Sequence, residues 1–174
     1  MPAFEATVIT TTRLVLTPLR QADADAMVEV LGDERLHEFI GGQPATRDEL
    51  RRRYERLAGG SGDPDTVWLN WIVRRDGTQE PVGTAQATVT RAGDGWTAAI
   101  AWVIGVPWQA QGFATEAARA LVDWLHDRDA SAITANIHPD NHASAKVAAR
   151  AGLTPTPDEL DGERVWRRPR TAGP

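Results

Sequence analysis

The chain has 174 residues and no cysteine. It can therefore form no disulfide framework, no thiolate metal site and no cysteine nucleophile. It also has no excess of basic charge, because 24 Asp and Glu outnumber 19 Lys and Arg and give a net charge of −5. Nucleic-acid-binding domains are usually basic, so we expect no nucleic-acid partner. The one basic run, Arg51-Arg52-Arg53, is interpreted as the solvated face of a helix.

No apolar run approaches the ~20 residues that cross a membrane, and the N-terminus shows no charged-then-apolar signal pattern. We therefore expect a cytoplasmic protein with no membrane partner. The hydrophobic content of 41% and the charged content of 25% are ordinary for a globular domain. The length suits one core, so we expect a single domain over residues 8–168 and a disordered tail over 169–174. The sequence leaves open whether the protein forms a homodimer.

Segments with strand and helix periodicity follow one another along the chain. Thr46 and Glu49 form a capping box at the start of one helix, and Asp94-Gly95 is typical of a hairpin turn. Helices are expected over residues 23–31, 33–39, 47–58, 114–125 and 142–151. Strands are expected over residues 8–17, 67–74, 82–90, 96–104 and 133–137, followed by a hairpin over 153–167.

This order of elements predicts a mixed α/β fold. Three antiparallel strands precede a strand–helix–strand unit, so the sheet is mostly antiparallel and has flanking helices. Because crossover connections are right-handed, strand 133–137 should lie parallel beside strand 96–104. The helix between them has one continuous apolar stripe, formed by Ala117, Ala118, Leu121, Val122 and Leu125.

The turn before that helix has the features of a phosphate-binding loop. The apolar strand ends at Gly105, and residues 109–115 lead directly into the helix. Unpaired backbone N–H groups at the start of a helix lie at the positive end of its dipole and hold phosphates. Gly112 has the clearest role, since a side chain there would block the approach of the backbone to a ligand. The alternative is a plain turn before a helix.

These residues resemble the signature of the GCN5-related N-acetyltransferases (GNAT). Gln109-x-x-Gly112-x-Ala114 matches the Gln/Arg-x-x-Gly-x-Gly/Ala motif of that family. The segment from Gly112 to Ala117 resembles the Gly-Tyr-Ala-Thr-Glu-Ala of its ribosomal-protein-acetyltransferase-like (RimJ/RimL-type) branch. Further similarity to this branch lies in Thr12-Arg13-Leu14-Val15-Leu16, Asn141-His142-Ala143-Ser144 and Ala151-Gly152-Leu153. The resemblance covers about residues 11–166.

The resemblance implies a GNAT sheet whose parallel strand pair splays apart to admit the pantetheine arm of acetyl-CoA. Acetyl-CoA would be the co-substrate, and no metal is implied. Val103 and Ile104 would present main-chain groups to the thioester, although both residues also suit a buried strand. The full set of implied coenzyme-binding residues is Val103, Ile104, Gln109, Gln111, Gly112, Phe113, Ala114, Thr115, Asn141 and Ser144.

Acetyl transfer to an amine needs a neutral amine, a donor for the developing oxyanion and a proton for the departing thiolate. The backbone at Val103 is the expected oxyanion donor. Ser144 is the expected partner of the thiolate, because residues 147–152 contain no tyrosine. His138 is a candidate base or acceptor contact, whereas His37, His126 and His142 are expected in solvent. Asn141 suits a helix N-cap as well as a coenzyme contact.

The strand over residues 96–104 departs from the family pattern. Many relatives read Ala-Glu-Ile-Gly-Tyr-Trp, with the Glu toward the acceptor amine, whereas Ala99 stands at the position of that Glu here. The identity of the base is therefore open. We expect an acetyl-CoA-dependent N-acetyltransferase that acts directly on a primary amine, of a small molecule rather than of a protein N-terminus. The alternative is a catalytically weak acyl-CoA-binding sensor or scaffold on the same fold.

Overall fold

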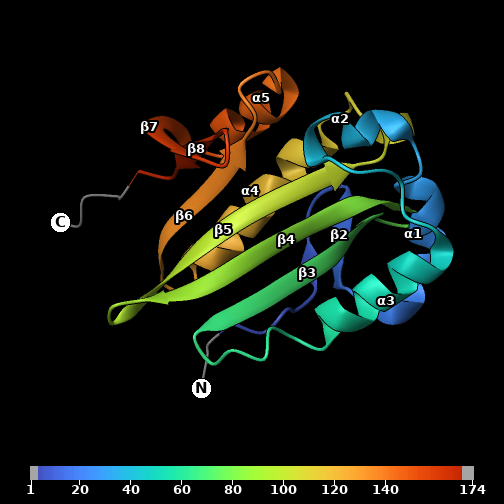
Figure 1. Ribbon diagram of the computed structural model, residues 1–174, viewed down its shortest axis with the longest axis horizontal. Coiled ribbons are helices and arrows are strands. Elements are labelled where there is room, and N and C mark those ends of the chain that lie inside the picture. Colours follow the sequence, from blue (N-terminus) through green and yellow to red (C-terminus); the bar gives the residue numbers. More distant parts are fainter. Residues whose placement is uncertain (1–3, 170–174) are drawn as a thin grey trace.

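The computed structural model describes residues 4–169, which form an eight-stranded sheet with helices on both faces (Figure 1). The strand order is β1-β2-β3-β4-β5-β6-β8-β7, and β5 and β6 form a parallel pair within an otherwise antiparallel sheet. This confirms the mixed, mostly antiparallel fold. The strands are β1 (Ile9–Thr10), β2 (Leu14–Pro18), β3 (Thr66–Arg75), β4 (Pro81–Ala92), β5 (Gly95–Ile104), β6 (Ala130–Ile137), β7 (Thr154–Leu160) and β8 (Glu163–Arg167).

The helices cover the two faces of the sheet unequally. One face is covered by α4 (Phe113–His126), which runs behind β5 in Figure 1. On the opposite face α1 (Ala24–Val30) and α3 (Arg47–Ala58) cover one side of the sheet. The short α2 (His37–Ile40), preceded by the 3-10 turn η2 (Glu34–Leu36), lies near the end of β5, and α5 (His142–Arg150) follows β6. The middle of that face, over β4 and β5, is left open.

The predicted apolar stripe of α4 packs on the sheet. Its five members are each at most 2% exposed, and they belong to one core together with buried residues of β3 such as Leu69 and Val73. Trp71 of β3 and Trp124 of α4 lie edge to face, with ring centroids 5.3 Å apart. A second core lies on the opposite face, where α1 and α3 pack on β3. It contains Leu19, Ala24, Met27, Val30, Leu50, Tyr54 and Ile72.

The expectation of one strand over residues 8–17 is wrong, because two strands form there. The chain reverses at 11–13, so that Ile9 pairs with Leu16. The turn is held by Thr11, whose amide donates to the Leu14 carbonyl at 2.9 Å and whose hydroxyl accepts from the Leu14 amide at 3.0 Å. Four consecutive polar residues, Thr10–Arg13, interrupt the apolar pattern at this turn, but they include no glycine, proline, asparagine or aspartate that would mark a reversal of the chain.

The local signals for the other elements are confirmed with small shifts. Thr46 and Glu49 form the capping box of α3, with the Thr46 amide donating to the Glu49 carboxylate at 2.8 Å. The residues between β4 and β5 are Gly93 and Asp94, one position earlier than expected. Asp161 and Gly162 connect β7 to β8 as expected, both with positive φ, as a tight hairpin turn requires.

No helix within residues 4–169 is long and apolar enough to span a membrane. Apart from Pro169, the tail expected to be disordered lies outside the described residues.

Candidate active site

The parallel strands β5 and β6 separate partway along their length. They pair from Trp96 with Ala130 as far as Ala99 with Thr134, and no pairing continues beyond that point although β5 runs on to Ile104 and β6 to Ile137. Over its second half β6 is bound to β8 on its other edge. The splay implied by the family resemblance is therefore present, and it opens a gap between the two strand ends.

The register of β4 and β5 decides which peptide groups face this gap. The amide of Gly105 donates to the Val82 carbonyl at 2.8 Å, so in this antiparallel register the odd-numbered residues of β5 bond to β4. The N–H and C=O of Val103 therefore point toward β4, which differs from the role expected for its main chain. The peptide groups of Trp102 and Ile104 point toward the gap, while the Val103 side chain lines the cavity described below.

The loop after β5 leads to an open helix N-terminus. A 3-10 turn, η3 (Val106–Trp108), precedes two residues with left-handed backbone, Ala110 at φ 60° and Gly112 at φ 84°. A left-handed alanine is strained, and such strain concentrates at ligand-binding loops. No side chain caps α4, and the first bond of its ladder runs from the Glu116 amide to the Gly112 carbonyl. The amides of residues 113–115 are therefore available to an anion.

Several predicted loop residues support this geometry. The Gln109 side chain donates to the Ile104 carbonyl at 2.9 Å and so ties the loop to the end of β5. Phe113 is buried against the core, whereas Ala114 and Thr115 are half-buried and Gln111 is exposed.

An ion pair between Arg13 of the N-terminal hairpin and Glu116 of α4 holds the loop in place. Arg13 donates from Nε to Glu116 at 2.7 Å and from Nη1 to the Gln111 carbonyl at 2.8 Å. Its guanidinium lies over the Phe113 ring, 4.6 Å from the centroid. Thr11 also donates to Glu116, at 2.7 Å. Burial raises the pKa of Glu116, but the hydrogen bonds from Thr11 and Arg13 outweigh it, so the pKa lies below its ordinary value. Glu116 is therefore a structural anion.

We expect Glu116→Gln to reduce acetyl-CoA affinity about 3- to 10-fold and to lower stability by ~1–3 kcal/mol, because it unpairs Arg13 and Thr11 beneath the loop. The folded-state pKa of Glu116 is below the ordinary 4.5, so its contribution exists above that pH and is lost as the pH falls through the folded-state pKa. Thermal melts should show a difference from wild type that is full at pH 7 and shrinks below pH 4.5. Glu55→Gln, an exposed acid on α3, is the matched control and should change neither quantity.

At the other strand end, α5 begins beside the gap. The Asn141 side chain accepts from the Ser144 amide at 3.1 Å, which confirms the N-cap. Unlike α4, this helix has its N-terminus closed by its own side chain. The Ser144 hydroxyl makes no hydrogen bond to any of residues 4–169. Ser144 lines the same cavity as Val103.

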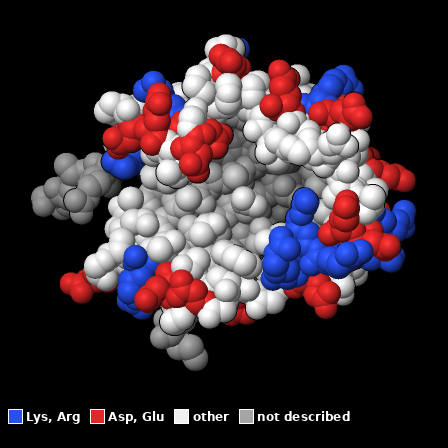
Figure 2. Space-filling model, in the orientation of Figure 1, with Lys and Arg blue, Asp and Glu red and all other residues white. Residues whose placement is uncertain are grey.

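A cavity of about 390 Å³ lies on the open face of the sheet and reaches the splayed strand ends. Figure 2 shows this hollow at the centre of the face. Its floor is formed by one side of β3, β4 and β5. Its walls come from α1, α2 and α3 on one side and from β6, β8 and the start of α5 on the other. Among residues 4–169, no group of three or more His, Asp and Glu is placed to hold a metal ion.

His138 stands where the two walls meet. Its ring and that of Phe39 lie 5.3 Å apart, centroid to centroid. The Asp140 amide donates to His138 Nδ1 at 3.1 Å, so the neutral ring carries its proton on Nε2. In that tautomer His138 is a donor rather than a base. His126 and His142 are exposed as expected, but the expectation for His37 is wrong, because it is half-buried and lines the cavity.

Ala99 lies on the open face, just before the lining of the cavity begins at Ile100, so it contributes no group to the cavity. Several residues that do line the cavity were not identified from the sequence. Glu163 of β8 is instead the acidic side chain in the lining. Arg53 and Tyr54 of α3 also line it, together with Asn70, Thr84 and Gln86 of the floor. Strand alternation places the floor residues on one face, but only the tertiary fold shows that the face remains uncovered.

Comparison with known proteins agrees with this geometry. Residues 13–154 match the family model described as an acetyltransferase (GNAT) domain. A comparison with curated protein sequences finds no match. Among solved structures, a GNAT-family acetyltransferase from Bacillus anthracis is 21% identical, with a TM-score of 0.72, over 92% of this chain and 94% of that one.

Two further solved structures contain ligands. RimL, a ribosomal alpha-N-protein acetyltransferase in complex with coenzyme A, is 18% identical with a TM-score of 0.75, over 93% of this chain and 97% of that one. AAC(6')-Ib, in complex with paromomycin and acetyl-CoA, is 24% identical with a TM-score of 0.70, over 88% and 91%. At these identities the structures establish a shared fold.

The splayed strand pair, the glycine turn and the open helix N-terminus define an acetyltransferase fold. The family model covers most of the chain, so the protein belongs to the GNAT acetyltransferase family and is an N-acetyltransferase by class.

Proposed function

We propose that the protein transfers the acetyl group of acetyl-CoA directly to a primary amine of a small molecule. The observation that carries this proposal is the junction of three features: the open N-terminus of α4, the gap beyond Ala99 and Thr134, and the cavity on the open face. The amides of residues 113–115 would hold the pyrophosphate. The gap would admit the pantetheine arm, and the cavity would hold the acceptor.

In the proposed reaction the amine nitrogen forms a bond to the acetyl carbon while the carbon–sulfur bond breaks. The peptide groups of Trp102 and Ile104 that face the gap would bind the thioester and its developing oxyanion. The Ile104 carbonyl is already tied to Gln109, which leaves its amide for this role. Ser144 would hydrogen-bond the departing thiolate, which takes up a proton as the amine loses one. Since the chain has no cysteine, no thioester can form on the enzyme.

A small acceptor is favoured by the size and lining of the cavity. Its walls contain many apolar residues, including Leu31, Leu36 and Phe39. The enclosing contact between Phe39 and His138 restricts access for a polypeptide. The alternative, an acyl-CoA-binding sensor or scaffold, is favoured by one observation: Ala99 supplies no carboxylate near the acceptor site. Coenzyme binding without amine-dependent release of thiol would support that alternative.

We expect kcat/KM to rise with pH toward the acceptor's own pKa, with no plateau near neutrality. An alkyl amine has a pKa near ~10.4, so on the order of one molecule in a thousand is neutral at pH 7. Ala99 cannot take the proton, and the neutral His138 ring holds its own proton on Nε2. Thiol release should be followed for two amines of different basicity, and the inflection should move with the amine. A plateau that begins at the same pH for both amines would contradict this and would show that a group of the enzyme acts as the base.

A further inference from the structure

The floor of the cavity carries side-chain amides and no charge. The lining residues that belong to β3, β4, β5 and β6 include Asn70, Gln86 and Asn136, and they include no lysine, arginine, aspartate or glutamate. The residues before and after each of the three amides belong to the core on the α4 face of the sheet. Because side chains alternate along a strand, the three amides point to the open face.

These amides have free hydrogen-bonding groups. Within residues 4–169, the side chains of Asn70, Gln86 and Asn136 make no hydrogen bond to another group of the protein. The fully buried side-chain polar atoms that lack a partner in this part of the chain belong to Tyr54 and Arg168 instead. Asn70 is half-buried, and Gln86 and Asn136 are exposed. The three amides are therefore accessible from the cavity.

The amides lie in one row across the sheet. Asn70 is paired with Gln86, and Gln86 with Ala101. The ladder between β5 and β6 ends two residues earlier, so Ala101 and Asn136 stand on opposite sides of the gap. Neighbouring strands are ~4.8 Å apart, so Gln86 lies about 5 Å and Asn70 about 10 Å from the edge of the gap. Ala101 has only a methyl group, which leaves room for a chain that runs from the gap to these two amides.

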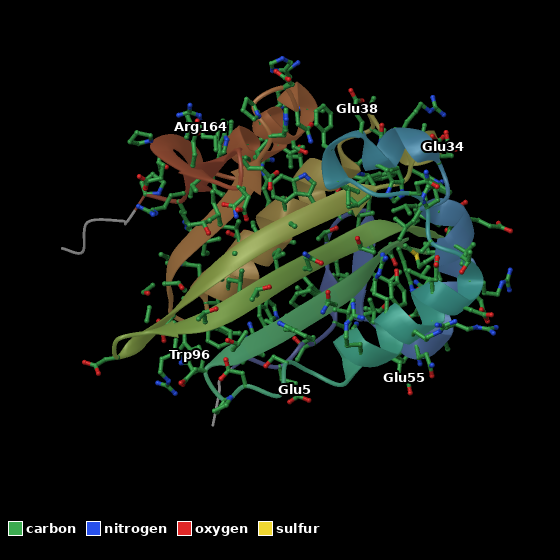
Figure 3. The ribbon with its side chains drawn as sticks, in the orientation of Figure 1. Glu5, Glu34, Glu38, Glu55, Trp96 and Arg164 are labelled. Carbon is green, nitrogen blue, oxygen red and sulfur yellow. The ribbon has the colours of Figure 1, made fainter. Side chains whose placement is uncertain are left out.

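The charged residues of the lining come from the walls and not from the floor. They are Arg53 of α3 and Glu163 of β8. The acids Glu34, Glu38 and Glu55 of the helical wall are exposed and point away from the floor of the cavity (Figure 3). A charged group that lay over the floor would lose hydration without gaining an opposite charge beside it.

We propose that the acceptor is an amine with an uncharged body, whose hydroxyl or amide groups bind the side chains of Gln86 and Asn70 while its amine lies at the gap. This rests on the proposed function and narrows its acceptor class. A carboxamide both donates and accepts hydrogen bonds, as the hydroxyl and amide groups of a ligand do. An alkyl body would displace water from the two amides without replacing its hydrogen bonds, which lowers affinity by about tenfold or more.

Acetylation of ω-substituted alkyl amines of increasing length tests this proposal. The far end of the chain carries a hydroxyl, a primary amide, a methyl, a carboxylate or a second ammonium group. We expect wild type to prefer the hydroxyl or the amide over the methyl by about tenfold or more in kcat/KM at the best length. The carboxylate and the second ammonium group should both be disfavoured. The better of the hydroxyl and amide series identifies the group that the floor binds.

Gln86→Met keeps the length of the side chain and removes its amide. It should lower kcat/KM for the hydroxyl and amide acceptors at least severalfold and raise it for the alkyl amine. Asn70→Leu should have the same effect on the longer acceptors, which reach β3. Thr88→Val is the matched control and should change neither value. Thr88 lies on the same face of β4, two residues further on, and is not part of the lining.

Binding of these amines to the coenzyme A complex, measured by calorimetry, separates this proposal from acetyl transfer itself. Tighter binding of the hydroxyl or amide amine than of the alkyl amine, weakened severalfold by Gln86→Met and not by Thr88→Val, supports the polar floor even in a protein that acetylates no amine. Equal or better use of the alkyl, carboxylate or diamine acceptors overturns the proposal. A polar preference that survives both Gln86→Met and Asn70→Leu also overturns it, as does failure of the hydroxyl and amide amines to bind wild type.

Discussion

Gly112→Glu is expected to weaken acetyl-CoA binding by about 100-fold or more. Gly112 precedes α4 with a left-handed backbone at φ 84°, which a glutamate adopts only with strain. The added carboxylate would face the proposed pyrophosphate. Two like charges ~4 Å apart repel by about 4 kcal/mol at a protein surface, which is several hundredfold in affinity.

Gly112→Glu can also weaken acetyl-CoA binding through its effect on Arg13. A Cβ at residue 112 would lie 3.2 Å from Arg13 Nη2. A glutamate there can draw Arg13 away from Glu116 and so loosen the clamp beneath the loop. Either arrangement damages the phosphate site.

Calorimetric titration of acetyl-CoA measures the effect. Gly112→Asn is the matched control, because asparagine tolerates a left-handed backbone and adds no charge, and we expect its affinity to stay within a few fold of wild type. An acetyl thioester of pantetheine, which lacks the phosphates, should bind wild type and Gly112→Glu equally. Equal acetyl-CoA affinity in wild type and Gly112→Glu would remove the loop from the coenzyme site.

Ser144→Ala is expected to lower kcat about 10- to 100-fold with little change in acetyl-CoA affinity. Ser144 lines the cavity at the splayed strand ends, and in the proposed reaction its hydroxyl would hydrogen-bond the departing thiolate. The helix cap uses the backbone amide of Ser144, which alanine retains. The substitution should therefore leave the melting temperature unchanged, which separates chemistry from folding.

Asn141→Ala serves as the control, because its main expected effect is on the stability of the protein and not on the departing thiolate. It removes the side chain that caps α5, so stability should fall by ~1 kcal/mol. Single-turnover measurements of thiol release distinguish the two variants. An unchanged kcat in a folded Ser144→Ala protein would leave Ser144 with a helical role only.

Much of the fold could be predicted because its signals are local. The capping box at Thr46, the N-cap at Asn141 and the turn at Asp161-Gly162 each depend on a few adjacent residues. The apolar stripe of α4 follows from helical spacing alone. The missed hairpin at 11–13 is different, because the polar run there contains none of the residues that usually mark a turn.

The cleft residues could not be predicted because they meet only through the tertiary fold. Glu163 lies about 60 residues after β5, the strand in which Ala99 stands at the position of the family carboxylate. Nothing in the sequence around Glu163 marks it as a cavity residue. Tyr54 fits the apolar stripe of α3, so its unpartnered hydroxyl becomes visible only with its surroundings. The main-chain direction at Val103 depends on its register with β4, which spacing within one strand does not specify.

The fate of an isotope-labelled acetyl group tests direct transfer most directly. Wild type is incubated with labelled acetyl-CoA and the amine panel, and the label is traced by mass spectrometry in the small molecules and in the intact protein. We expect the label on the acceptor nitrogen in proportion to the thiol released, with none retained on the protein. Bound coenzyme without transfer to any amine, or label held on the protein before the amine is added, would contradict direct transfer.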